Sequence, residues 1–150
     1  MKKFVWRLQR LLDIKIKQED AKRSELVAVT ERALSVRSQI MVQRAALRKM
    51  LGELSEKKAK QRLSEQEFFL RYAHVSDEEI KKLELKLSEL EKLRQLKIEE
   101  IMKIRRFRKG LERLRAETKA KFLKEEEKHE QKDLDDKTIM SIARKMIQPA

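Results

Sequence analysis

The sequence predicts an all-α protein, a long antiparallel two-helix coiled-coil hairpin with a C-terminal helical extension. Apolar residues recur at alternating intervals of three and four along two stretches, as in helices that wrap around one another. Charged residues make up 43% of the chain and aromatic residues 5%, a composition typical of long helices. Two glycines and one proline leave few turn-forming residues. We expect residues 1–150 to form a single coiled-coil domain.

The first apolar stretch predicts a helix over about residues 3–60. Its seam positions are Val5, Leu8, Leu12, Leu26, Val29, Ala33, Val36, Ile40, Leu47, Met50 and Leu54. Four polar residues interrupt this seam: Lys15, Glu19, Lys22 and Gln43. Such a narrow stripe buries one helix face against a partner helix.

The second stretch predicts a helix over about residues 65–146. Its seam positions are Ile80, Leu83, Leu87, Leu90, Leu93, Ile101, Ile104, Phe107, Leu111, Leu114 and Phe122, with Lys97 and Thr118 as exceptions. Near the C-terminus an apolar face returns at Ile139, Ile142, Ala143 and Met146. This segment, Thr138 to Ile147, is interpreted as a short amphipathic helix, or as a continuation of the long helix docked on Phe4, Leu8 and Leu11.

The connection between the two helices is predicted at about residues 60–65, with 74–77 as the alternative. Neither region contains glycine or proline, but each carries a capping-box pattern, at Ser64 to Glu67 and at Ser76 to Glu79. Periodicity alone leaves both positions open.

Several classes of chemistry are disfavoured by the sequence. There is no cysteine for a disulfide, a thiolate metal site or a nucleophile. Glu126 and His129 share a helix face, but a di-iron bundle needs a second such motif and further carboxylates. Gly52 and Gly110 stand alone in helical context, so no phosphate-binding loop is expected. We therefore predict no enzyme activity, no cofactor and no metal site.

The apolar runs are also too short for a membrane span, since the longest is Leu26 to Val29. Arg7, Gln9 and Arg10 interrupt what would be the apolar core of a signal peptide. We expect a soluble cytoplasmic protein.

The charge is unevenly placed. The net charge is +13, with 13 Lys/Arg against four Glu between Lys92 and Lys124, and a run of acidic residues from Glu125 to Asp136. The basic cluster from Arg105 to Lys109 raises the alternative of a nucleic-acid-binding coiled coil, beside that of a generic structural scaffold. Because Phe107 is expected inside the seam and stacking aromatics are missing, nucleic acid is the less favoured partner.

Three segments resemble the flagellar FliJ family and its virulence type III secretion relatives. Phe4 to Asp13 resembles the family's opening pattern of alternating aromatics followed by leucines. Phe68 to Tyr72 resembles its aromatic patch at the start of the second helix, although His74 stands where a further aromatic is usual. The closing pattern comprises Leu114 to Glu117, Phe122, Glu125 to Glu127 and Glu130 to Asp136.

This resemblance implies a cytoplasmic stalk, peripherally associated with the inner-membrane export apparatus. It implies insertion into the hexameric export ATPase, contact with the cytoplasmic domain of the export-gate membrane protein, and in some members contact with export chaperones. It also implies a turn before the aromatic patch, which favours the Ser64 cap over the Ser76 cap.

Two interaction sites follow as hypotheses. The ATPase-binding site comprises Phe4, Trp6, Leu8, Leu11, Leu12 and Phe122. The export-gate site comprises Phe68, Phe69, Leu70 and Tyr72. For Trp6 two interpretations stay open, an anchor for the ATPase or packing on the C-terminal helix. Because Phe68 and Phe69 point about 100° apart on a helix, at least one aromatic of the second site should be exposed.

Overall fold

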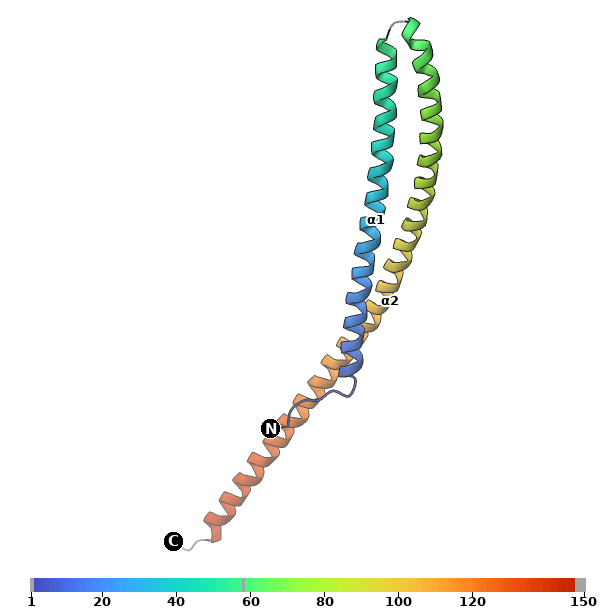
Figure 1. Ribbon diagram of the computed structural model, residues 1–150. Coiled ribbons are helices and arrows are strands. Elements are labelled where there is room, and N and C mark those ends of the chain that lie inside the picture. Colours follow the sequence, from blue (N-terminus) through green and yellow to red (C-terminus); the bar gives the residue numbers. More distant parts are fainter. Residues whose placement is uncertain (1, 58, 148–150) are drawn as a thin grey trace. The chain divides into compact units, whose positions relative to one another are not determined.

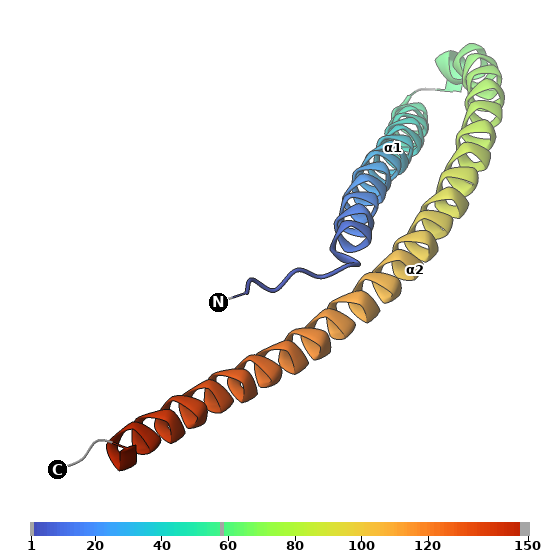
Figure 2. The same ribbon diagram turned by 90° about the horizontal axis from the view of Figure 1, so that it is seen from below.

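The chain forms two long helices that pack against each other as an antiparallel hairpin (Figures 1 and 2). In the computed structural model, which describes residues 2–57 and 59–147, α1 spans Gln9–Glu56 and α2 spans Ala59–Ile147. The described residues contain no strand. The predicted all-α hairpin is therefore confirmed.

The helix break lies earlier than the sequence predicted. Because α1 ends at Glu56 and α2 begins at Ala59, the expected turn at about residues 60–65 lies within α2, and Ser64 does not cap a helix. The side chain of Lys57 forms an ion pair with Glu65, Nζ to Oε2, at 2.6 Å. This pair joins the end of α1 to the second turn of α2 and helps to hold the connection short.

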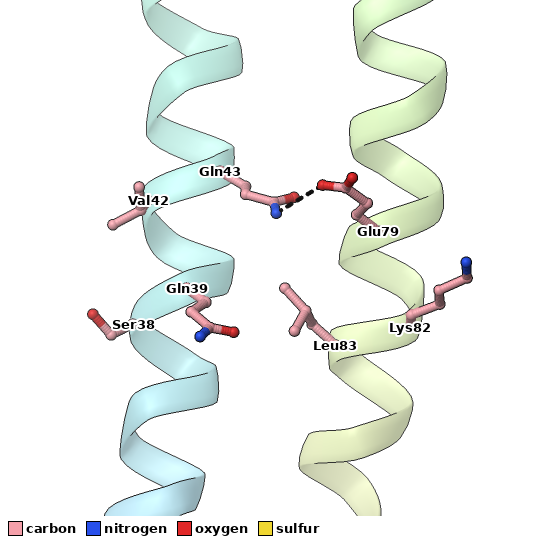
Figure 3. A pocket seen from close by; sticks show the side chains of 7 residues that line it. All are labelled: Ser38, Gln39, Val42, Gln43, Glu79, Lys82 and Leu83. Carbon is pink, nitrogen blue, oxygen red and sulfur yellow. Dashed lines mark hydrogen bonds between the residues drawn. The ribbon is translucent and has the colours of Figure 1, made fainter.

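The alternative turn at 74–77 also lies inside α2. There Ser76 is buried, and its hydroxyl donates to Oε1 of Gln43 on α1 at 3.5 Å. The amide of Gln43 donates in turn to Glu79 at 3.1 Å, as Figure 3 shows. The serine of this capping-box pattern thus bonds across the hairpin, because a buried hydroxyl needs a partner and Gln43 provides one.

Contacts divide the chain into two compact units. One, here called the hairpin unit, is Glu19–Lys103, and the other, the terminal unit, combines the residues up to Gln18 with those from Ile104 onward. The core of the hairpin unit is formed by Val36, Ile40 and Ile80, with Leu47, Leu83, Leu87 and Leu90 packed against it. These are predicted seam positions, so the 3-4 spacing identified the core of this unit correctly.

Polar residues that interrupt the predicted seams are paired across the hairpin unit. Lys22 on α1 contacts Glu25 at 3.4 Å and Glu100 at 3.1 Å, and Lys97 on α2 contacts the same two carboxylates at 2.8 Å and 3.8 Å. The four side chains form a closed ring of alternating charge. A polar layer of this kind fixes the pairing register of a coiled coil at some cost in apolar burial.

In the terminal unit the seam of α2 differs from the predicted one. Leu111 is buried, but Phe107 and Leu114 are exposed, and Arg108 and Arg115 are the half-buried side chains beside them. The predicted spacing used two consecutive intervals of three, from Ile101 through Ile104 to Phe107. Strict alternation of three and four requires the next seam position to be 108, so the seam passes through arginines.

Candidate protein-interaction surfaces

An apolar cluster in the terminal unit contains most of the residues predicted for ATPase binding. Trp6, Leu12 and Leu111 are its buried members, and Phe4, Leu8 and Leu11 pack against it. The ring of Phe4 lies 5.5 Å from that of Phe122, centroid to centroid, at an interplanar angle of 52°, within the usual range for aromatic pairs. All six predicted residues therefore lie in one neighbourhood of the terminal unit.

The first residues of this cluster are not helical. Because α1 begins at Gln9, the predicted helix start at about residue 3 is corrected by some six residues. Arg7 and Leu8 form a turn before the helix, closed by a hydrogen bond from the amide of Gln9 to the carbonyl oxygen of Trp6 at 3.1 Å. Phe4, Trp6 and Leu8 pack in the cluster, whereas Val5 is exposed and does not belong to a seam.

Trp6 packs inside the protein. Its side chain is 8% exposed and contacts the cluster that includes Leu111 of α2. Of the two interpretations left open, packing on the C-terminal helix is the one that this burial supports. Phe4 and Phe122 are half-buried, whereas Trp6 and Leu12 are buried.

Arg115 connects the two elements of this cluster. Its Nε donates to Oε1 of Gln9 at 2.8 Å, and its guanidinium carbon lies 5.6 Å from the centre of the Phe4 ring. A cation at this distance from an aromatic face is attracted to it. The half-buried arginine thus holds the extended N-terminal segment against α2, a role that the predicted apolar seam did not include.

The predicted export-gate residues lie near the start of α2 on more than one helix face. Phe68 is 64% exposed, Leu70 and Tyr72 are also exposed, and Phe69 is half-buried. The expectation that at least one of these aromatics faces solvent is confirmed. Phe69 and Phe68 line a cavity of about 250 Å³ together with Met50 and Leu54 of α1.

Helical geometry divides this set. Phe68 and Tyr72 are four residues apart and share a face, whereas Leu70 lies about 200° from Phe68 around the helix. The exposed Val75, seven residues after Phe68, continues the face of Phe68 and Tyr72. Val75 was not predicted, although the i, i+4, i+7 spacing in the sequence identifies it.

The C-terminal part of α2 has no partner within the described chain. Helix α2 continues to Ile147, and every residue from 127 to 147 is exposed. The apolar side chains in this stretch are Leu134, Ile139, Met140, Ile142, Ala143, Met146 and Ile147. Of the two interpretations of Thr138 to Ile147, continuation of the long helix is correct, but docking on Phe4, Leu8 and Leu11 is not observed.

The basic cluster around Phe107 also differs from expectation. Phe107 is exposed and not within the seam, and Nζ of Lys15 on α1 lies 4.9 Å from the centre of its ring. Arg108 is ion-paired with Glu112 at 2.8 Å. Part of the positive charge is thus engaged in contacts within the protein.

Two searches of the described residues returned nothing. No cluster of three or more His, Asp and Glu side chains there has the geometry to hold a metal ion. No helix in the same part of the chain is long and apolar enough to span a membrane.

Comparison with known proteins identifies a protein family. A family model described as the flagellar FliJ protein matches residues 3–146, nearly the whole chain. No curated protein matches significantly, and no solved structure does. The match includes both helices and both predicted interaction sites.

Proposed function

Since this chain belongs to the flagellar FliJ protein family, and hence to the components of the flagellar export apparatus, we propose that it is the central stalk of the export ATPase. In this role it promotes assembly of the ATPase ring and connects the ring to the export gate. The observation that carries the proposal is the family match together with a hairpin of two long helices. Helices without internal proline are suited to such a part because no proline introduces a sharp kink.

The terminal unit is proposed to bind the ATPase. Its apolar cluster presents Phe4 and Phe122 at its edge, and the exposed apolar residues Val5 and Leu123 lie beside them in the sequence. Trp6, Leu8, Leu11 and Leu12 form the support that positions this edge. Aromatic side chains held by a packed base are typical anchors in protein interfaces.

Titration of the purified chain into its cognate export ATPase tests the stalk proposal. We expect both ATP turnover and hexamer formation to rise and to saturate near one chain per six ATPase subunits. Phe4→Ala with Phe122→Ala should weaken the interaction by about tenfold or more, while Leu85→Ala, an exposed apolar position in the hairpin unit, should not. If micromolar chain changes neither turnover nor assembly, the stalk proposal is wrong.

The aromatic patch of the hairpin unit is proposed to bind the export gate, with Phe68 and Tyr72 in direct contact and Phe69 and Leu70 around them. Large exposed apolar side chains close together support an interaction surface. Phe68→Ser with Tyr72→Ser should abolish binding to the cytoplasmic gate domain and leave ATPase stimulation within about twofold of the original. Loss of both activities together would indicate a folding defect, which circular dichroism would detect.

A further inference from the structure

Helix α1 carries exposed apolar residues outside its seam within the hairpin unit. One face is the seam with α2, which contains Val29, Ala33, Val36 and Ile40. The other carries Val27, Leu34 and Met41, spaced by seven residues, with Val42 beside Met41. Seven residues are close to two helical turns, so these three side chains lie in one row, about 130° around the helix from the seam, and Val42 lies about 100° further round, past the point directly opposite the seam. We call Val27, Leu34, Met41 and Val42 the outer face of α1.

The outer face is exposed in the described chain. Leu34 is 57% exposed, Met41 70% and Val42 65%. The solvent side of the facing stretch of α2 is mostly charged, with Leu85, Leu93 and Leu96 among its exposed apolar residues. An apolar helix face is normally covered, and here α2 covers only the seam of α1.

Glu31, between Val27 and Leu34, is acidic, and the charged residues of α1 beyond it are basic as far as Gly52. From Arg32 to Gly52, α1 contains five basic residues and no acidic residue; the basic residues are Arg32, Arg37, Arg44, Arg48 and Lys49. Two of them are engaged on one flank of the hairpin, where Arg37 binds Glu91 and Arg44 binds Glu84, each at 2.6 Å. A binding partner for this face should therefore bring negative charge.

The opposite flank is open. There Ser38, Val42 and Leu83 line a groove of about 470 Å³ between α1 and α2, with Lys82 on its α2 side. Figure 3 shows Leu83 pointing towards α1, while Ser38 and Val42 lie on the outer side of α1. Glu79 also lines the groove and accepts a hydrogen bond from Gln43 across it at 3.1 Å. Val42 borders this groove, whereas Met41 lines a cavity on the first flank with Arg37, Arg44 and Glu84, so the outer face of α1 extends from one flank to the other.

We propose that the outer face of α1 is the docking site for a third helix, an amphipathic helix of a partner protein with an apolar ridge and acidic flanks. The ridge packs on Leu34, Met41 and Val42, and the acidic flanks face the basic residues of α1 and Lys82 at the groove. A second copy of this chain is disfavoured as the occupant, because pairing two outer faces would bring the five basic residues of each α1 together. The proposal does not depend on binding to the ATPase or the gate.

A designed peptide provides the probe. It is a fluorescein-labelled amphipathic helix of about six turns with leucine at a and d positions and glutamate on both flanks; a matched peptide carries lysine in place of glutamate. Fluorescence anisotropy with the full chain at 150 mM salt should show saturable binding of the glutamate peptide. Binding of the lysine peptide should be at least tenfold weaker.

Two double variants of equal charge separate docking from general attraction to a basic chain. Leu34→Glu with Met41→Glu should weaken binding of the glutamate peptide at least twentyfold. Val75→Glu with Leu85→Glu, which places the same two charges at exposed apolar positions of α2, should change it by no more than twofold. Because all four positions are exposed, both variants should retain the helical circular dichroism of the original chain.

A charge exchange completes the test. Arg48→Glu with Lys49→Glu should reduce binding of the glutamate peptide and improve binding of the lysine peptide. Equal losses in the two double variants above, or no saturable binding below about 100 µM, would overturn the proposal. It would also be overturned if the chain were a dimer by light scattering and Leu34→Glu with Met41→Glu made it a monomer, since a second copy would then occupy the face.

Discussion

Individual polar side chains, more than apolar ones, distinguish this hairpin from a generic coiled coil. Glu19, at a seam position, is 3% exposed and is bound by Arg23 at 3.0 Å. Lys22 and Lys97 stand at seam positions of opposite helices and share two carboxylates. A shift of the helix pairing by one heptad would place these charges against apolar residues, which is costly. The polar positions therefore select one register.

Leu111 and Leu114 test the corrected seam directly. Leu111 is 7% exposed and Leu114 43%, although the apolar pattern alone suggests that both are buried. Leu111→Ala should destabilise the protein by about 2 kcal/mol, whereas Leu114→Ala should cost less than about 0.5 kcal/mol. Urea unfolding monitored by the fluorescence of Trp6, the chain's single tryptophan, reports on this cluster. If the two substitutions destabilised the protein equally, the corrected seam would be wrong and the seam predicted from the sequence would be favoured.

The carboxyl group of Glu25 should make the stability of the protein depend on pH. Its hydrogen bonds, first from Lys97 and then from Lys22, lower the pKa of its carboxyl from the ordinary 4.5. A carboxyl whose pKa is lower in the folded state adds stability above its unfolded pKa and loses it as the pH falls through the folded value. The contribution of Glu25 should therefore be full well above pH 4.5 and be lost as the pH falls through the lower pKa of the folded state.

Glu25→Gln should accordingly lower the melting temperature at pH 7 by no more than about 2 °C, since an exposed charged group contributes little. The difference from the original chain should become smaller as the pH falls below 4.5. Melting curves followed by circular dichroism between pH 3 and pH 7 measure it. Glu89→Gln, at another exposed carboxylate, is the matched control and should leave the pH profile as it is.

Lys22 shows the complementary behaviour at high pH. Its hydrogen bonds, first to Glu100 and then to Glu25, raise the pKa of its ammonium group above 10.5. The stability that it contributes is present below the unfolded pKa and is lost as the pH rises through the higher folded value. The charge ring is therefore intact throughout the physiological pH range.

Each of the two helices has an apolar face that the other helix does not cover. Over Ala33 to Leu47, α1 contains two charged residues, Arg37 and Arg44, and leaves an apolar face open to solvent. The end of α2 carries an unpaired apolar face of its own, from Leu134 to Ile147. Neither face is needed for the packing of α1 against α2. Exposed apolar faces of this kind are typical of a protein that acts through partners.

Gly110 offers a test of helix propensity within α2. A Cβ atom built at this position meets nothing within 4 Å, and the backbone has no positive φ angle there. Gly110→Ala should stabilise the protein by about 1 kcal/mol, because glycine loses more conformational freedom than alanine in a helix. The reverse change at a nearby exposed residue, Ala116→Gly, should destabilise by a similar amount. Thermal melting would contradict the prediction if Gly110→Ala lowered the midpoint.

For the protein in its entirety, net charge separates the functional alternatives. A chain with a charge of +13 will attract duplex DNA at low salt through its phosphates, and this attraction falls steeply as salt rises. We expect DNA binding in 50 mM salt to weaken by at least about a hundredfold in 200 mM salt. The proposed stimulation of the export ATPase, which we attribute to apolar contacts, should change by less than about fivefold over the same range. DNA binding that resists salt would revive the nucleic-acid alternative.

Much of the architecture was predictable from the order of residues. The heptad spacing identified both helices and the core around Val36, Ile40 and Ile80, because a buried face repeats with the helical period. Composition predicted the lack of strands among the described residues, and local motifs pointed to the flagellar family that the family model then confirmed. Heptad spacing, composition and local motifs can all be identified from residues that are close together in the sequence.

Where two segments meet was decided only by the tertiary structure. Trp6 was equally consistent with an anchor and with a packed residue, because its burial depends on Leu111, more than a hundred positions away. Ser76 matched a capping box but bonds to Gln43, and the seam of α2 passes through Arg108 and Arg115 because the facing helix sets its register. Periodicity specifies which face of a helix is apolar; contacts between helices, which no local pattern contains, determine what covers that face.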